Sequence, residues 1–364
     1  FIDARDSMID ADCAANACAN EESIWGGFAD RGLGYKAHAS LAIAYEYGVK
    51  ESFLTPYLDA LAPVIDDSLE NGGGFVNPGE TVFLRVPLFN PWRNASKGVP
   101  GAHAVLTSGN PDVLITDGTS DYGPIPAGGT SLGDPFTFTL GPGAACGSSL
   151  EFDLATTSPL GKATTSFVVR VGRPTGAGAP ITLTRAIPGG LSIPDGSDHG
   201  VTDNFPIDQD LEIADLDFRV DDIAHSWVGQ LSVFLKGPSG LGMVLIHRPA
   251  SSQPEPGDWN PELLDGTNDG DNFINTRIDD SSVHDLFSAG PRAAPFTGDW
   301  LPFANSPSLV YFGELVTDEQ LIHFNGQSTR GTWQVLVNDY KTGDVGTLNS
   351  WSLIVTPVAY QCGP

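Results

Sequence analysis

The residues with the clearest capacity for chemistry are acidic and lie close together in the third quarter of the chain. The segment 265–272 reads DGTNDGDN, which contains Asp265, Asp269 and Asp271, and the pair Asp279 and Asp280 follows it. Carboxylates that alternate with glycine suit a loop around a hard cation, because calcium prefers oxygen ligands. The order differs from an EF-hand loop, which has glycine at its sixth position and glutamate at its twelfth. We predict calcium binding here, with a solvated acidic loop as the alternative.

A hydrolase site has little support in the sequence. His225 and Ser226 are adjacent, but a catalytic triad needs a nucleophile, a base and an orienting acid that the fold brings together. We expect His225 to be a hydrogen-bonded structural histidine that precedes a strand. The 45 acidic residues produce many accidental carboxylate pairs, and no stretch favours the paired acids of a glycoside hydrolase.

The four cysteines indicate an oxidising compartment. They are Cys13, Cys18, Cys146 and Cys362, and an even number at wide spacing is typical of an exported protein with two disulfides. Three pairings are open; one joins Cys13 to Cys18 across a short loop and leaves Cys146 to pair with Cys362. The chain has no CxxC sequence and no clustered Cys/His spacing, so we predict no zinc in this chain. The expected location is secreted and extracellular.

The composition restricts the class of partner. The chain of 364 residues carries 45 Asp and Glu against 18 Lys and Arg, a formal charge of −27. Such a surface repels phosphates, so we expect no nucleic-acid binding and no docking on anionic lipid. No apolar run is long enough to span a bilayer, and no membrane insertion is expected. The 43 glycines and 28 prolines favour many short strands joined by turns.

Helical patterns are confined to residues 1–66. The run 3–12 is rich in helix formers, and we expect Met8, Ile9 and Ala11 to face a core. A second helix is predicted before Gly32 and Gly34. Its apolar face consists of Ile24, Trp25, Phe28 and Ala29.

Strand patterns occupy the rest of the chain. Residues 67–175 are expected to form a β-sandwich of immunoglobulin-like size, with strands at 82–88, 103–107, 113–116, 134–140, 149–156 and 165–171. A glycine-rich linker at 69–79 leads into the first of these strands, and a second linker follows them at 174–180. In the last quarter, Trp333, Val335 and Val337 alternate with polar residues, and a similar run contains Trp351. The two runs predict a hairpin with both tryptophans on its buried face.

The late motifs resemble the P domain, a β-jelly-roll module that follows the catalytic domain in kexin- and furin-like convertases. The residues that carry the resemblance are GTWQVLVNDYKTGDVGTLNSWSLIV at 331–355 and AHSWVGQLSVFLKGPSG at 224–240. The resemblance implies a jelly roll at 180–358, with a tail at 359–364. It also strengthens the calcium prediction, above all for Asp279 and Asp280. Gln230 stands where the family usually has aspartate, and Asp339 and Asp344 are expected to cap a turn.

The N-terminal motifs resemble the C-terminal end of the peptidase domain in fungalysin-type zinc metallopeptidases. They are ARDSMIDAD at 4–12 and IWGGFADRGLGYKA at 24–37, and they imply that residues 1–66 are a helical remnant of that domain. The family's active site needs His-Glu-x-x-His on one helix. None of the seven histidines is followed by glutamate, and none has a second histidine four residues later. We therefore predict that the chain is inactive alone.

A spacer motif lies between these two resemblances. The sequence NPGETVFLRVPLFN at 77–90 resembles the CARDB-like or immunoglobulin-like spacer found between peptidase and P domains. The family's preceding loop is often rich in Asp and Asn, which implies a second, weaker calcium site at Asp66, Asp67 and Glu80.

The sequence thus predicts a mainly β protein with a short helical segment, an immunoglobulin-like sandwich and a P-domain jelly roll. The favoured function is the non-catalytic C-terminal region of a secreted fungalysin-like zinc metalloprotease, which stabilises the enzyme or binds a substrate or surface. Its partner would be the upstream peptidase domain or fragment, or a protein or surface ligand. The alternative is a free-standing extracellular structural or adhesive protein. An exposed face at Trp25 and Phe28 would favour the first hypothesis, and a fully packed segment would count against it.

Overall fold

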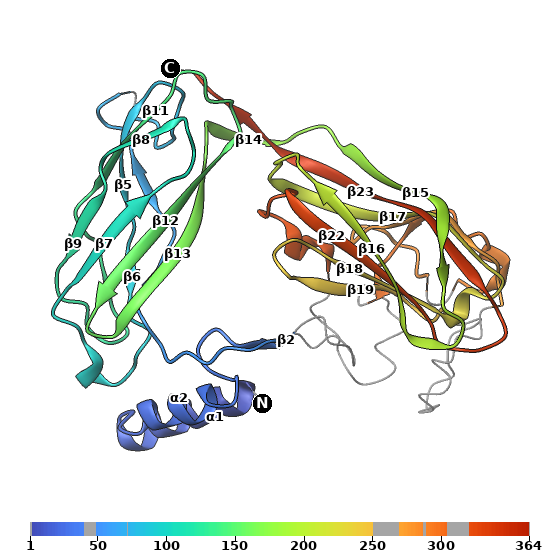
Figure 1. The fold of residues 1–364 in the computed structure, drawn as a ribbon, viewed down its shortest axis with the longest axis horizontal. Helices are drawn as coiled ribbons and strands as arrows, with labels where there is room; N and C mark the ends of the chain where they lie inside the picture. Colours follow the sequence, from blue (N-terminus) through green and yellow to red (C-terminus); the bar gives the residue numbers. More distant parts are fainter. Residues whose placement is uncertain are drawn as a thin grey trace. The chain divides into compact units, whose positions relative to one another are not determined.

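The computed structural model describes residues 2–39, 49–70, 72–249, 269–286, 289–303 and 320–363 (Figure 1). Its contacts group the chain into two compact units. The first contains residues 1–39, 49–175 and 359–364, and the second contains residues 176–358. The helical segment is therefore not a separate unit, because it belongs with the first set of strands.

Two helices, α1 (Ile2–Asn16) and α2 (Glu21–Ala29), lie beside each other in the first unit (Figure 1). Gly32 follows α2 at φ +76°, a conformation that favours glycine and ends the helix. The prediction that Met8 and Ala11 face a core is wrong: both are exposed, and Ile9 is buried. The buried face of α1 consists of Arg5, Ile9 and Asp12.

The helical segment is shorter than the predicted 1–66. Four short strands follow α2, namely β1 (His38–Ala39), β2 (Val49–Lys50), β3 (Asp59–Ala60) and β4 (Val64–Asp66). β3 pairs with β6 and β4 pairs with β5, so the end of the segment belongs to the sandwich. Val64 and Ile65 are β-branched, which favours a strand over a helix.

The rest of the first unit is built mainly from two four-stranded sheets, in the orders β4-β5-β11-β8 and β13-β12-β7-β9, with a smaller sheet of order β10-β6-β3. The strands are β5 (Thr81–Arg85), β6 (Leu88–Phe89), β7 (Ala102–Thr107), β8 (Val113–Asp117), β9 (Thr119–Tyr122), β10 (Thr130–Ser131), β11 (Phe136–Leu140), β12 (Ser149–Ser158) and β13 (Gly161–Arg170). Alternate residues of β11 and β12 are buried, as expected where only one face of a sheet meets the core. Phe138 and Phe152 meet there, with ring centroids 5.1 Å apart.

The second unit also has two sheets around one core. One has the order β14-β23-β17-β20-β21, with β15 also paired to β23, and the other has the order β16-β22-β18-β19. The strands are β14 (Arg173–Ala177), β15 (Ile181–Ile193), β16 (Ser197–Ile207), β17 (Ile213–His225), β18 (Leu231–Lys236), β19 (Gly242–His247), β20 (Phe273–Ile278), β21 (Gly298–Trp300), β22 (Gly331–Asp339) and β23 (Gly346–Gln361). This mainly β architecture agrees with the predicted sandwich and jelly roll.

The predicted C-terminal hairpin is wrong, although both of its strands exist. β22 pairs with β16 and β18, whereas β23 pairs with β15 and β17. The turn between β22 and β23 therefore connects the two sheets (Figure 1). Trp333 and Trp351 are fully buried in the common core, one from each sheet. Period-two alternation shows which face of a strand is buried but does not identify its neighbour.

Within the described ranges, neither helix has the length and apolarity needed to cross a lipid bilayer.

Candidate functional site: the seat of the helical pair

The inner face of α1 is polar and holds both ends of α2. Arg5 donates from Nη1 to the carbonyl oxygens of Leu33 and Gly34, at 2.9 and 2.7 Å, and lies over the ring of Trp25. At the other end, Asp12 accepts hydrogen bonds from the backbone nitrogen and the side chain of Asn20. The carboxylate before α2 complements the helix dipole, and the guanidinium holds the turn that follows α2.

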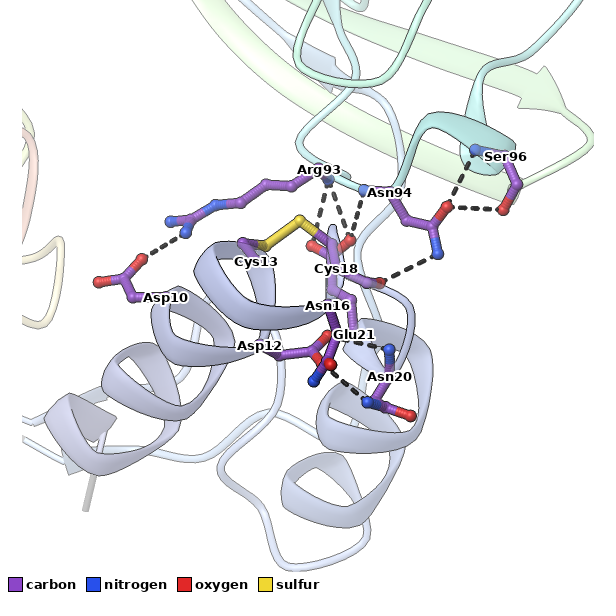
Figure 2. Close-up of a disulfide and its surroundings, with 10 residues drawn as sticks. All are labelled: Asp10, Asp12, Cys13, Asn16, Cys18, Asn20, Glu21, Arg93, Asn94 and Ser96. Atoms are coloured by element: carbon purple, nitrogen blue, oxygen red, sulfur yellow. Dashed lines mark hydrogen bonds and ion pairs between the residues drawn. A yellow bond between two sulfur atoms is a disulfide. The ribbon is translucent and has the colours of Figure 1, made fainter.

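The hydrogen bonds on Asp12 also set its charge. Burial raises the pKa of the Asp12 carboxyl, but the hydrogen bonds from Asn20 and Asn16 outweigh it, so the pKa lies below its usual value. Asp12 therefore carries its charge at neutral pH, beside the start of α2 (Figure 2). Buried polar groups of this kind fix one arrangement of the two helices because each needs its partner.

The helical pair is attached to the sandwich through Glu21. This side chain is 1% exposed, and its carboxylate accepts hydrogen bonds from the backbone nitrogens of Arg93, at 3.0 and 3.2 Å, and Asn94, at 2.8 Å. Asn94 in turn donates from Nδ2 to the carbonyl oxygen of Cys18 at 3.0 Å. Figure 2 shows these groups converging between the two helices and residues 93–96. We call the loop 90–97, including the short η1 (Ala95–Lys97), the seat loop.

Ion pairs surround this buried contact. Arg93 pairs with Asp10 of α1, and Lys97 lies 2.7 Å from Glu22 of α2. Lys97 also lies over the ring of Trp92, 4.8 Å from its centroid. Opposite charges at the edge of the contact align the two surfaces, although exposed pairs contribute little free energy each.

The apolar part of the seat is small. Ile9, Trp25 and Trp92 form the buried cluster, and Trp92 comes from the seat loop. The indole nitrogen of Trp92 donates to the carbonyl oxygen of Pro56 at 2.9 Å. The face at Trp25 and Phe28 is not the exposed one that the first hypothesis anticipated, because Trp25 is 8% exposed and Phe28 is half-buried. The apolar surface left exposed lies on the outer side of α1 instead.

The structure selects one of the three open cysteine pairings. Cys13 is bonded to Cys18, and Cys146 is bonded to Cys362. The first disulfide closes the turn between the helices, where Ala17 and Cys18 both have positive φ. That turn aims the carbonyl oxygen of Cys18 at Asn94 (Figure 2). The second disulfide spans 216 residues and fastens the end of the chain to the first unit.

The described residues of the main predicted calcium cluster do not converge. Asp265 lies outside the described residues, and Asp269 and Asp271 are exposed. Asp279 accepts hydrogen bonds from Arg277 and Ser281, which outweigh burial and lower its pKa. Asp280 accepts from the backbone nitrogens of Leu321 and Ile322, while burial raises its pKa. The parts of the chain that the structure covers contain no group of three or more His, Cys, Asp or Glu placed to hold a metal ion.

The second predicted calcium set is engaged with its own loop. Asp67 accepts from the backbone nitrogens of Gly73 and Gly74, and Glu80 accepts from the backbone and side chain of Asn77. Asp66 accepts from the backbone nitrogen of Ser68, and this hydrogen bonding lowers its pKa. Backbone amides thus donate hydrogen bonds to all three carboxylates. These contacts do not test calcium binding, which stays a prediction.

His225 has both ring nitrogens occupied. Its Nδ1 accepts from the backbone nitrogen of Trp227 at 3.0 Å, which places the proton on Nε2, 3.2 Å from Asp339. Burial raises the pKa of the Asp339 carboxyl. Ser226 donates to Asp344 instead of His225, so no nucleophile faces a free nitrogen. This arrangement cannot act as a triad, because the base needs one nitrogen for the nucleophile.

Gly129–Gly133 has the G-x-S-x-G spacing of a nucleophile elbow but not its structure. Ser131 lies in β10, which pairs with β6, and the next element is the strand β11. An elbow needs a strand followed by a helix. The motif therefore gives no support to a serine hydrolase.

A second charged cluster, which the sequence did not identify as a unit, lies on the sheet containing β17, β20 and β21. Arg277 lies between three carboxylates, at 3.5 Å from Asp217, at 3.3 Å from Asp299, and in hydrogen-bond contact with Asp279. Burial and the neighbouring Asp279 raise the pKa of Asp217 to about 7. One arginine cannot neutralise three carboxylates, so the pKa of the most buried one rises.

Two protein families match parts of the chain. The fungalysin metallopeptidase (M36) model matches residues 1–37, and the proprotein convertase P-domain model matches residues 313–355. These matches fit a fungalysin-like C-terminal region. The first match covers both helices and stops after the turn that Arg5 holds, and the second covers β22 and most of β23. No curated protein matches this chain significantly.

Solved structures resemble this chain only distantly. The serine protease of Aeromonas sobria in complex with its chaperone is 15% identical, with a TM-score of 0.26, over 57% of this chain and 36% of that one. The same protease alone is 14% identical, with a TM-score of 0.25, over 58% and 37% of the two chains. A SusE-like protein is 11% identical, with a TM-score of 0.18, over 78% and 96%. The chain thus spans little more than a third of the Aeromonas protease.

Sequence reasoning missed the residues that hold the helical pair on the sandwich. Glu21 stands at the start of a helix, where acidic residues are common for reasons of dipole alone. Asn94 had a signal, because Asn94-Ala95-Ser96 has the form of a glycosylation sequence. In the structure, the side-chain oxygen of Asn94 accepts hydrogen bonds from Ser96 and its nitrogen donates to Cys18. Contacts across more than 70 residues leave no periodic trace in a sequence.

Proposed function

We propose that this chain is the non-catalytic C-terminal region of a secreted fungalysin-like metalloprotease, in which the seat loop fastens the end of the peptidase domain to the first sandwich. The observation that carries the proposal is the match of residues 1–37 to the peptidase family, combined with the buried Glu21 contact that joins these residues to the sandwich. The first sandwich would then be held at a fixed exit from the enzyme.

The outer face of α1 supports an upstream partner. Ala4, Met8, Ala11 and Ala15 are exposed and recur at spacings that place them on one side of the helix. Met8 alone is 55% exposed. The helix thus buries Arg5 and Asp12 beside Ile9 and leaves an apolar stripe exposed, whereas Asp3 and Asp10 are exposed as on an ordinary surface helix. The rest of the peptidase domain would cover this stripe.

The first test is native mass spectrometry of the protein purified from its source, with metal analysis of the same sample. We expect a zinc-containing peptidase segment that is either continuous with this chain or bound to it. Bound calcium in the same sample would also support the predicted acidic-loop site. A lone zinc-free chain or homopolymer that does not cleave casein would refute the proposal and favour a free-standing structural or adhesive protein.

A variant pair tests the α1 face directly. Met8→Asp places a charge in the apolar stripe, and Val283→Asp makes the same type of change at a residue of the second unit that is 84% exposed. In the complete protease, Met8→Asp should lower the midpoint of thermal inactivation, whereas Val283→Asp should leave it unchanged. Equal behaviour of the two variants would show that nothing covers the stripe.

A further inference from the structure

The second unit contains a pocket of about 360 Å³ that no part of the proposed function uses. It lies where β15 and β17 end and β23 begins, next to the turn that joins the two sheets. Its lining includes Ser192, Ser226, Asp271, Asn272, Val345 and Thr347. This volume is within the range of pockets that hold small ligands or single side chains.

The wall of the pocket is held rigidly. Thr347 of β23 pairs with Ser192 of β15 on one side and with Ala224 of β17 on the other. Asn272 is fixed by two hydrogen bonds to the backbone of His225, each 2.9 Å long. Glycine is required at position 346 of this wall, since a Cβ there would lie 2.4 Å from the imidazole of His225. Binding would therefore need no ordering of the backbone that carries the polar groups, which lowers its entropic cost.

Several hydrogen-bond acceptors in this pocket are uncommitted. Within the described ranges, the structure gives no hydrogen bond or ion pair to the carboxylate of Asp271 or to the hydroxyls of Ser192 and Thr347. The residues outside those ranges include no lysine and no arginine, so those residues offer no cation for Asp271. At the rim, Val345 is 71% exposed and offers apolar surface beside the polar groups.

We propose that this pocket binds a lysine side chain of a partner polypeptide. An ammonium group has three donors and no acceptor, which matches one carboxylate and two hydroxyls. The aliphatic stem of lysine would lie against Val345 and Ala224. The formal charge of −27 on the chain attracts a basic partner and speeds its encounter. A calcium ion would need six to eight oxygen ligands, whereas Asp271 is the pocket's one carboxylate among the described residues.

The experiment is an NMR titration of the isotope-labelled full chain with the peptide acetyl-Gly-Lys-Gly-amide. The same peptide with norleucine in place of lysine is the ligand control, because it keeps the stem and lacks the charge. Asp271→Asn is the test variant. Asp269→Asn is its matched control, since Asp269 is an exposed aspartate two residues earlier that is not in the pocket lining. Thr347→Val removes one hydroxyl and keeps the β-branched shape.

We expect the lysine peptide to shift the amide resonances of Asn272, Gly346 and Thr347, and the norleucine peptide to leave them unchanged. Asp271→Asn should weaken binding by about fivefold or more, the factor that corresponds to about 1 kcal/mol for a partly exposed ion pair. Thr347→Val should weaken it less, and Asp269→Asn should bind as the unmodified chain does. Equal affinity of the Asp271→Asn and Asp269→Asn variants would overturn the proposal. So would equal binding of the norleucine peptide, or displacement of the lysine peptide by millimolar calcium with the same amide shifts.

Discussion

The sharpest prediction concerns Glu21, whose replacement by glutamine should detach the helical pair from the seat loop. The carboxylate accepts from two backbone nitrogens, those of Arg93 and Asn94, and it is almost fully buried. One oxygen, Oε2, accepts from both nitrogens, and Oε1 lies 3.2 Å from the nitrogen of Arg93. A glutamine oxygen at the Oε2 position keeps both hydrogen bonds without their charge and turns its NH₂ group toward the N–H of Arg93. The lost charge and the two facing donors together cost about 2 kcal/mol.

Amide hydrogen exchange at Arg93 and Asn94 measures this loss directly. A cost of about 2 kcal/mol should speed exchange through local opening by about 30-fold at both amides. Glu22→Gln is the matched control, because the side chain of Glu22, the next residue, is 69% exposed and pairs with Lys97 at the surface. That change should cost less than about 0.5 kcal/mol. Equal exchange rates in the two variants would refute the reasoning, since Glu21 would then not hold the seat.

Three further predictions address the two units. The pKa of Asp217 is raised to about 7, so between pH 3.8 and 7 this carboxyl binds more protons in the folded state than in the unfolded state. Its contribution to stability therefore falls as pH rises. The pKa of His247 is lowered by burial to about 4, so the contribution of this imidazole to stability rises with pH up to pH 6.5. Urea unfolding of Asp217→Asn should therefore change the slope of stability with pH by about +1.4 kcal/mol per unit relative to the unmodified chain, and parallel profiles would contradict this. Gly346→Ala should lower the thermal midpoint of the second unit, because the new Cβ would lie 2.8 Å from the Ala224 carbonyl oxygen. Gly26→Ala should raise helix stability by up to about 1 kcal/mol, because a Cβ there would have no atom within 4 Å. A stabilising Gly346→Ala together with a destabilising Gly26→Ala would refute the packing. Replacing Cys146 and Cys362 by alanine should destabilise the first unit by about 3–5 kcal/mol in chemical unfolding, because the disulfide closes a loop with a sequence separation of 216, and an unchanged midpoint would show that it contributes nothing.

The local elements could be predicted because their signals are local. Val82, Leu84, Val86 and Leu88 alternate in the sequence, and all four are buried. The same alternation at Trp333 and Trp351 correctly predicted burial but not pairing, since the partners of each strand lie elsewhere in the chain. A short turn between two strands suggests a hairpin, yet a jelly roll uses such a turn to pass from one sheet to the other. The topology depends on contacts that no short window contains.

The seat shows a different limit. Periodicity assumes that the buried side of a helix is apolar, so Met8 and Ala11 were expected in the core together with Ile9. The structure instead buries Arg5 and Asp12 beside Ile9, because these two side chains find fixed partners before α2 and in the turn after it. A buried charge becomes tolerable once its hydrogen bonds are made, and only the position of α2 reveals those bonds.

The exposed apolar stripe of α1 also bears on the choice between the two functions. Burying Arg5 and Asp12 fixes the geometry of the pair but adds little net stability, because desolvation offsets much of each interaction. The apolar stripe contributes nothing while water covers it, although burying a methionine side chain alone is worth about 1.5–3 kcal/mol. A helix of a free-standing protein would be more stable with Met8 buried, as Ile9 is. α1 gains this stabilisation only when a second surface covers Met8, as the proposed peptidase domain would.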